Sequence, residues 1–355
     1  MIQMMQLYWK IFDYFSLPHW IGAMLLLVIK FAMVAALMVL VVLFLVLLER
    51  KFLALLTVRK GPNRVGVYGL LQTIADAIKL LFKEDIIPDK ADKILFMVAP
   101  IVFFFPVLVV YGLIPFAKDF VAIDASCGLI LALAITSVGI LGLLSAGWAS
   151  NNKYSIIGAM RSVAQAISYE LPLVFSALGI VVLAGSMNLN RIAALQGNVF
   201  GWYIFPSFLG FLIFLTCTIA ELNRTPFDLP EAESELVSGY NTEYSGMRFA
   251  LFFLAEYAAL FIYSALIVTL FFGGYSSPLG VYVFDFLPYL DKIVFVEQFL
   301  WLMLKTFAII LLIMWIRATL PRLRADQLMA FSWKFLLPLS FLNLFWLAIL
   351  KYFIG

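Results

Sequence analysis

The chain has 355 residues, of which 65% are hydrophobic and 13% are charged, and its net charge is +3. A soluble domain carries about 25% charged residues, so this chain has too few polar side chains to cover a water-facing surface. The basic residues are spread among many segments, which excludes the clustered basic face of a nucleic-acid-binding protein. The composition predicts an all-α, polytopic membrane helix bundle that forms a single integral membrane domain over residues 1–355.

Few residues are suited to hold a redox cofactor. The chain has two cysteines, Cys127 and Cys217, both in apolar runs, and a single histidine, His19. An iron–sulfur cluster needs about four thiolate ligands, and no glycine-rich dinucleotide-binding fingerprint follows a strand-like segment. We therefore expect that this chain alone binds neither a metal ion nor a redox cofactor.

Long apolar runs define the predicted transmembrane helices. A bilayer core requires ~20 apolar residues per helix, and about eight runs meet this requirement. They lie at 20–48, 95–116, 127–148, 167–186, 202–220, 249–272, 296–316 and 332–351. The first run is longer than the bilayer core needs, which suggests a tilted helix.

The distribution of lysine and arginine predicts the orientation. The loop after the first run holds nine of them, and the loops after odd-numbered runs together hold 16. The N-terminal segment, the loops after even-numbered runs and the C-terminal segment together hold five. Because positive charge accumulates in cytoplasmic loops, we expect the odd-numbered loops in the cytoplasm and both termini on the periplasmic side.

Residues 68–84, between the first two runs, have helical periodicity. Leu71, Ile74, Ile78 and Leu81 recur at spacings of three and four, which is typical of one apolar face of a helix. Polar side chains recur at the same spacings on another face. The segment is therefore predicted to form an amphipathic helix along the membrane interface.

A further helix start is predicted in the loop after the fifth run. Asp228 can cap it, Pro230 suits its first turn, and Glu231 lies three residues beyond the cap. Glu235 shares a helix face with Asp228 and Glu231, whereas Glu233 points elsewhere. Acidic residues in a first turn are also favoured by the helix dipole.

Four carboxylates lie at or inside the expected membrane depth. Glu49 and Glu221 end their runs, whereas Glu170 and Glu256 lie within theirs. Charged groups at such positions are costly and usually mark an ion or proton path. For Glu49 and Glu221 a carboxylate in interfacial water remains equally consistent. For Glu170 and Glu256 a functional role is favoured, because their depth makes solvation expensive.

The basic residues allow structural and functional readings. Lys305 lies mid-run and needs a partner, which could be a buried structural pair or part of a relay. Arg50 follows Glu49 at a helix end, where the simplest reading is a topology anchor. On the amphipathic segment, Asp76 would by default be solvated and paired with Lys79.

Several loop motifs occur in order between about residues 45 and 340. They include Glu49-Arg50-Lys51, Arg59-Lys60-Gly61-Pro62-Asn63, Ala75-Asp76-Ala77-Ile78-Lys79-Leu80, Ile167-Ser168-Tyr169-Glu170, Glu221-x-Asn223-Arg224-Thr225-Pro226-Phe227-Asp228-Leu229, Glu233-Ser234-Glu235-Leu236-Val237-Ser238-Gly239, Ala255-Glu256-Tyr257 and Arg317-Ala318-Thr319-x-Pro321-Arg322. Together they resemble the H subunit family of the proton-pumping NADH–quinone oxidoreductases, respiratory complex I, whose mitochondrial counterpart is ND subunit 1.

The resemblance implies a membrane subunit that forms much of the quinone-access tunnel and begins the acidic path toward the pumping subunits. The family's quinone-tunnel positions correspond to Arg50, Arg59 and Asp76 and, more loosely, to Arg317. Its acidic-path positions correspond to Glu49, Glu170, Glu221, Asp228, Glu231, Glu233, Glu235 and Glu256. No departure from the family pattern occurs at these positions.

The same resemblance implies partners. Quinone is the expected substrate, and FMN and the iron–sulfur clusters are expected in partner subunits. The expected neighbours are the soluble quinone-site subunits of the peripheral arm, small membrane subunits and lipid, with no nucleic acid. The expected location is a bacterial inner membrane rather than the mitochondrial inner membrane.

Two competing readings use the same residues differently. A secondary transporter would bind substrate or ions at the buried carboxylates, but it would favour inverted repeats and broken helices, which the sequence does not contain. A related membrane subunit of a hydrogenase, or of a ferredoxin- or F420-linked quinone reductase, would share the fold and part of the motifs. The loop motifs here are fuller than a hydrogenase would require, and the identity of the electron donor stays open.

Overall fold

The structure, a computed structural model, describes residues 19–118, 120–229, 238–280 and 294–354. These parts are helical apart from turns and one isolated bridge between Ala117 and Phe120, which confirms the all-α prediction. The main helices are α2 (His19–Leu56), α4 (Lys93–Leu113), α5 (Gly128–Ala149), α6 (Lys153–Ala184), α8 (Phe208–Glu221), α10 (Gly246–Phe271), α11 (Val294–Thr319) and α13 (Leu337–Ile354). The shorter ones are η1 (Val67–Gly69), α3 (Gln72–Phe82), α7 (Leu189–Leu195), η2 (Val199–Gly201), η3 (Gly239–Asn241), α12 (Ala325–Phe331) and η6 (Ser332–Leu336).

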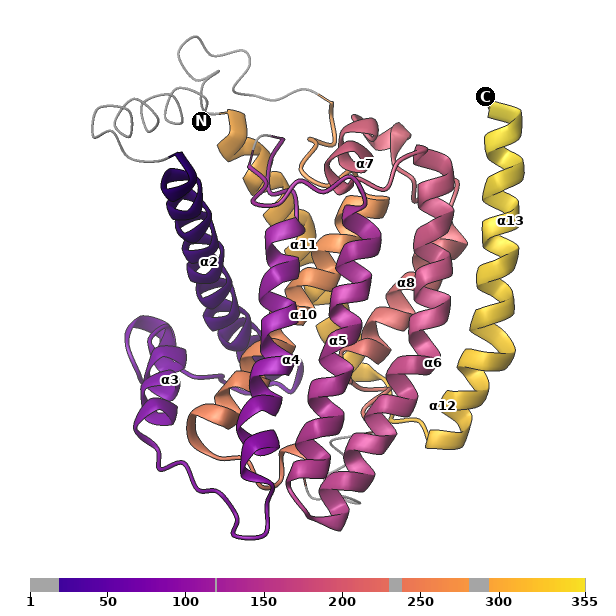
Figure 1. Cartoon of the computed structure of the whole chain (residues 1–355). Coiled ribbons are helices and arrows are strands. Elements are labelled where there is room, and N and C mark those ends of the chain that lie inside the picture. The colour runs from indigo at the N-terminus through magenta and orange to yellow at the C-terminus, as the bar shows by residue number, and fades with distance from the viewer. Residues whose placement is uncertain (1–18, 119, 230–237, 281–293, 355) are drawn as a thin grey trace.

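Each of the predicted apolar runs overlaps one of the main helices. Within the described residues, seven helices are long and apolar enough to cross a membrane, with α12, η6 and α13 counted as one continuous span. The chain is therefore an integral membrane protein. Figure 1 shows α3 and α12 near one end of the bundle and α7 at the other, and we name these ends the α3 face and the α7 face. The described ends of the chain, in α2 and α13, both lie at the α7 face.

Helix α8 is shorter than its predicted run. It has 14 residues and so spans roughly 21 Å, less than the ~30 Å of a bilayer core. The prediction of a helix from residue 202 was wrong, because residues 203–207 form turns and α8 begins only at Phe208. Glu221 and residues 222–229 after it are buried or half-buried, so other parts of the protein cover this irregular backbone.

Helix α6 is longer than its predicted run. It starts at Lys153, where the Asn152 side chain caps the backbone N–H of Tyr154 at 3.0 Å, rather than at residue 167. Polar residues such as Arg161 hid this first half from a hydropathy reading. Glu170 consequently lies near the middle of α6, not three residues from its start.

The predicted amphipathic helix is confirmed as α3. It lies beside the α3-face end of α2, outside the main bundle (Figure 1). Its apolar residues Leu71, Ile74, Ile78 and Leu81 are all exposed, as expected for a helix that presents one side to lipid or to a partner. This leaves its polar stripe free to meet α2.

Helix α10 forms the centre of the bundle. From Ala258 to Phe271 its side chains are almost entirely buried, and it packs against α2, α4, α8 and α11. Small residues allow other helices to approach closely, as in membrane bundles generally. A Cβ on Gly142 of α5, for example, would lie 2.7 Å from the backbone nitrogen of Phe103 in α4.

Candidate functional site

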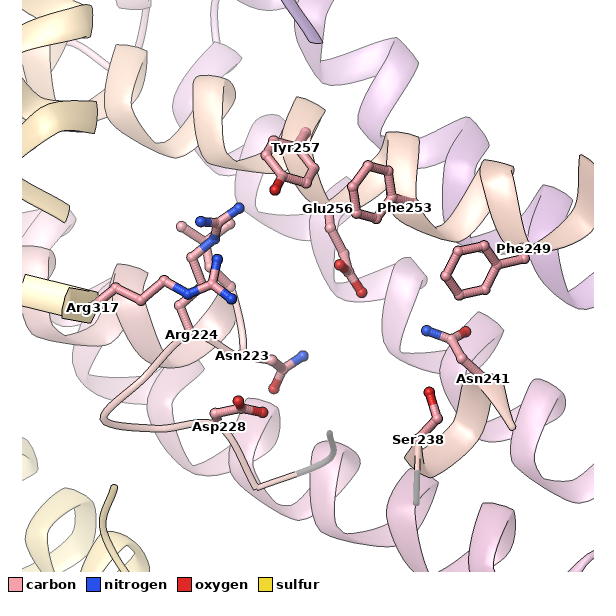
Figure 2. A pocket seen from close by; sticks show the side chains of 11 residues that line it. Asn223, Arg224, Asp228, Ser238, Asn241, Phe249, Phe253, Glu256, Tyr257 and Arg317 are labelled. Carbon is pink, nitrogen blue, oxygen red and sulfur yellow. The ribbon is translucent and has the colours of Figure 1, made fainter. Parts of the chain in front are cut away.

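A cavity of about 200 Å³ lies near the α3 face of the bundle. Its walls come from the segment after α8, from the segment around η3, from α10 and from the end of α11. The lining residues are Leu222, Asn223, Arg224, Asp228, Ser238, Asn241, Phe249, Phe253, Glu256, Tyr257 and Arg317. Figure 2 shows two guanidinium groups on one side of this cavity and carboxylates projecting into it from two walls.

The guanidinium groups belong to Arg224 and Arg317, and both bind Glu49. Arg224 Nη1 lies 2.7 Å from one Glu49 carboxylate oxygen, and Arg317 Nη1 donates to the other. Glu49 is only 3% exposed, so its charge is compensated by the two cations rather than by water. The three side chains carry a net charge of +1 and join α2 to α11 through the segment after α8.

Aromatic residues of α10 complete this part of the site. The Arg224 guanidinium lies 4.9 Å from the centre of the Tyr257 ring, a favourable cation–π distance. The adjacent residue, Glu256, accepts a hydrogen bond of 2.5 Å from the hydroxyl of Tyr240. Figure 2 shows Glu256 and Asp228 pointing into the cavity from opposite walls.

A second, much smaller cavity lies farther into the bundle. Its volume is about 10 Å³, which is close to the space of one water molecule. Glu170 and Glu221 both line it, and Ser137 donates a hydrogen bond to Glu170. One carboxylate oxygen of Glu221 is buried and has no hydrogen-bond partner among the described residues. Tyr263 of α10 also lines this cavity, so two carboxyls and a phenol meet where little water can reach.

The four predicted carboxylates thus lie in two separate environments, with two carboxylates in each. Glu256 lines the larger cavity, and Glu49 lies behind the arginines of its wall, whereas Glu170 and Glu221 share the smaller one. Of the four, Glu49 alone binds basic side chains among the described residues, namely Arg224 and Arg317. No ion pair joins Glu170, Glu221 or Glu256 to a basic side chain within the described ranges.

A separate polar contact lies where α3 meets α2. Arg50 Nη1 lies 2.5 Å from Asp76, and Gln72 donates to the other Asp76 oxygen at 3.0 Å. The default pairing of Asp76 with Lys79 was therefore wrong. The pair is partly exposed, at 43% for Arg50 and 35% for Asp76, so it stands at the surface between the interfacial helix and the bundle.

The other predicted site residues are distributed as follows. Arg59 lies exposed on the turn after α2, where its backbone N–H donates to Ala54. Arg317, grouped with the quinone positions, binds Glu49 at the cavity wall. The helix predicted to start at Asp228 would continue into residues that lie outside the described ranges. Glu231, Glu233 and Glu235 also lie outside these ranges.

Three residues of the site were not singled out from the sequence. Arg224 was read only as part of a motif, although a lone cation after a short apolar helix is a signal of a buried ion pair. Tyr240 and Tyr257 carried no such signal, because a tyrosine's partner depends on the tertiary fold. Arg224 binds Glu49 and lies over the Tyr257 ring, and Tyr240 donates a hydrogen bond to Glu256.

The sequence matches known proteins over nearly its whole length. Residues 29–348 match the model of a family described as NADH dehydrogenase. A Bacillus cytotoxicus protein, named as the H subunit of NADH-quinone oxidoreductase, is 52% identical over 307 residues, which cover 86% of this chain and 88% of that protein. A Dehalococcoides mccartyi protein of the same name is 49% identical over 325 residues, 92% of this chain and 86% of that protein. The family match extends from α2 into α13.

Proposed function

The chain belongs to the NADH dehydrogenase family, together with bacterial H subunits of NADH-quinone oxidoreductase, and from this premise we propose how its two polar regions act. The contact between α2 and α3 lines the route by which quinone enters. The two buried cavities form the first part of a path that couples quinone reduction to proton translocation. Electrons come from FMN and iron–sulfur clusters in partner subunits, because this chain has too few thiolates for a cluster.

The quinone route is supported by the character of the α2–α3 contact. A quinone has a small polar head on a long apolar tail, so its route needs an opening to lipid and polar groups farther in. Helix α3 presents exposed apolar residues on one side and the Arg50–Asp76 pair toward α2. Arg59 lies on the turn that follows α2. Arg317 lines the wall of the larger cavity, farther along the proposed route.

The acidic path is supported by one observation above all: Glu49 is buried and held by two arginines that line the same cavity as Glu256 and Asp228. Reduction of a quinone takes up two protons, which changes the charge near the path's entrance. In a site with a low dielectric constant, such a change acts over several ångströms. The Glu49 cluster therefore transmits it to Glu256, and Glu221 and Glu170 continue the path deeper into the bundle.

This role also sets the orientation and the partners. The basic loops after α2, α5 and α8 face the cytoplasm and dock against the soluble subunits that carry the quinone site, so both termini lie in the periplasm. Small membrane subunits take up the path beyond Glu170. Glu231, Glu233 and Glu235 belong to the cytoplasmic loop and contribute further acids at its entrance.

The most direct test is Asp76→Asn in the assembled complex. We expect quinone reductase activity to fall about tenfold, equivalent to ~1.4 kcal/mol, because Arg50 loses its charged partner at the quinone route. Reduction of a hydrophilic acceptor by the peripheral arm should be unchanged. Lys79→Gln, on the same helix but outside the pair, is the matched control. Equal quinone activity in both variants would contradict the assignment.

A further inference from the structure

We propose that Lys305 places a fixed positive charge across the α7-face end of the bundle and thereby stops protons in the acidic path from leaking to that side. The proposal rests on the proposed function, because it assumes that the carboxyls of the two cavities carry protons. It concerns a residue that lies outside both cavities and that the quinone route does not use.

The ammonium group of Lys305 is fully coordinated by backbone oxygens. Its Nζ lies 2.8 Å from the carbonyl oxygen of Phe272, 3.1 Å from that of Gly274 and 2.6 Å from that of Ser276. A lysine ammonium has three N–H donors and no acceptor, so each donor has one partner. A neutral amine has only two hydrogens and would turn its lone pair toward the third carbonyl, so this geometry favours the charged form.

The carbonyl cage is a consequence of how α10 ends. The last carbonyls of a helix lack intrahelical partners and carry the negative end of the helix dipole. After α10 the chain turns through Gly273 and Gly274, both with positive φ of 73° and 53°. Their conformation turns successive carbonyls toward one point, which Lys305 of α11 occupies. The Trp202 ring covers the ammonium at 4.9 Å.

A second buried side chain makes this cage rigid. Gln196 donates to the carbonyls of Thr269 and Leu270 at 3.1 and 3.2 Å, and its side-chain oxygen accepts from the backbone N–H of Gly273 at 3.1 Å. The cage is therefore braced independently of Lys305. It also supplies partial charges only, so the full positive charge of the lysine is not cancelled as it would be by a carboxylate.

The position of this charge fits a barrier. Along α10, Phe272 in the cage follows Tyr263, at the wall of the Glu170–Glu221 cavity, by nine positions, which is roughly 13 Å of helix. The intervening Leu266, Ile267 and Val268 are 0% exposed and apolar. At ~13 Å and an effective dielectric constant of ~20, one positive charge lowers the occupancy of a proton about tenfold. Positive groups exclude protons from other membrane pores by the same effect.

The test uses the whole complex in proteoliposomes, with Lys305→Met and Lys305→Gln as neutral variants. With quinone reduction inhibited, we measure the decay of an imposed pH gradient; during turnover, we measure protons translocated per NADH. We expect quinone reduction to be retained, the passive leak to rise about tenfold and the proton yield to fall. Lys351→Met, which removes an exposed lysine at the end of α13, should change nothing.

Two further variants separate the effect of charge from that of structure. Ser276→Asp adds a carboxylate beside the cage, and Lys305→Arg keeps the positive charge. A barrier predicts a raised leak for Ser276→Asp and a low leak for Lys305→Arg. An assembled neutral variant with normal leak and yield overturns the proposal, as does a Ser276→Asp variant with normal leak when neither neutral variant assembles. The proposed function is tested separately by Glu256→Gln with Lys305 intact. Normal proton translocation in that variant would contradict the proposed function.

Discussion

Glu49 is the residue on which the larger cavity depends most. Its carboxylate is the shared partner of Arg224 and Arg317, and Arg224 is 7% exposed. Removing one partner of a buried ion pair costs about 3–5 kcal/mol, because it leaves an uncompensated charge in the interior. A glutamine at position 49 keeps the volume but removes the charge that holds both arginines.

We therefore predict that Glu49→Gln lowers the stability of the assembled complex by about 3 kcal/mol and lowers quinone reductase activity. Thermal dissociation on native gels and the activity of the intact fraction measure the two effects. Lys60→Gln, an exposed change on the turn after α2, is the control. A complex that keeps full stability and full activity without the Glu49 charge would show that the arginines have other partners.

At the scale of elements, α3 is held to the bundle by more than the Arg50–Asp76 pair. The strap from α3 to α4 meets the start of α10, where Arg248 Nε lies 3.1 Å from Asp85 and the backbone N–H of Ile86 donates to Ser245 Oγ at 3.2 Å. Beside it, Tyr244 stacks on Phe96 at 4.0 Å, and burial raises the pKa of Tyr244 well above its usual range despite nearby Arg248. Tyr244 therefore stays neutral at physiological pH and acts here through packing.

Because this strap positions α3, we predict that Arg248→Asp and Asp85→Arg each raise the KM for quinone more than they lower kcat. The pair is partly exposed, so the effect of breaking it is about 1 kcal/mol or less, equivalent to at most about fivefold in KM. The double variant with exchanged charges should recover most of the loss. Independent, additive losses in the double variant would mean that the strap does not act through this pair.

The elements differ in how far the sequence could predict them. The main helices and α3 follow from apolar periodicity, which is a local property. The first half of α6 was missed because its polar residues lower its hydropathy, although it packs closely on the η3 segment, where a Cβ on Gly158 would lie 2.8 Å from Gly239. The pairing of Arg224 with Glu49 joins positions 175 residues apart, and the bond from Tyr240 to Glu256 depends on a turn; neither follows from local pattern. The motifs predicted which carboxylates matter but not how they are paired.

At the scale of the whole molecule, the polar groups are arranged asymmetrically. The larger cavity and the Arg50–Asp76 pair lie toward the α3 face, and the smaller cavity lies deeper in the bundle, whereas the α7 face is closed by buried apolar residues of α10 and by the Lys305 cage. A proton that enters from the α3 face therefore meets carboxyls first and an apolar, positively charged barrier beyond them. Lateral transfer to a neighbouring subunit is the route that this arrangement favours.

The coupling prediction follows from that asymmetry. Glu256 and Glu170 line different cavities, and neither has a basic partner within the described ranges. A glutamine preserves their volume and hydrogen bonding but cannot exchange a proton. We predict that Glu170→Gln and Glu256→Gln each assemble normally and each impair proton translocation. Because translocation and quinone reduction are tightly coupled, quinone reductase activity should fall as well.

Proton uptake and quinone reduction in vesicles measure both effects, with assembly checked on native gels. Glu84→Gln, which neutralises an exposed carboxylate on the strap before α4, is the control for loss of charge alone. The double variant should be no worse than the poorer single variant, because residues that act in series block the same step. Normal rate and normal proton yield in both single variants and in the double variant would remove these carboxyls from the mechanism. Loss of proton yield with full quinone activity would place them after the coupling step rather than within it.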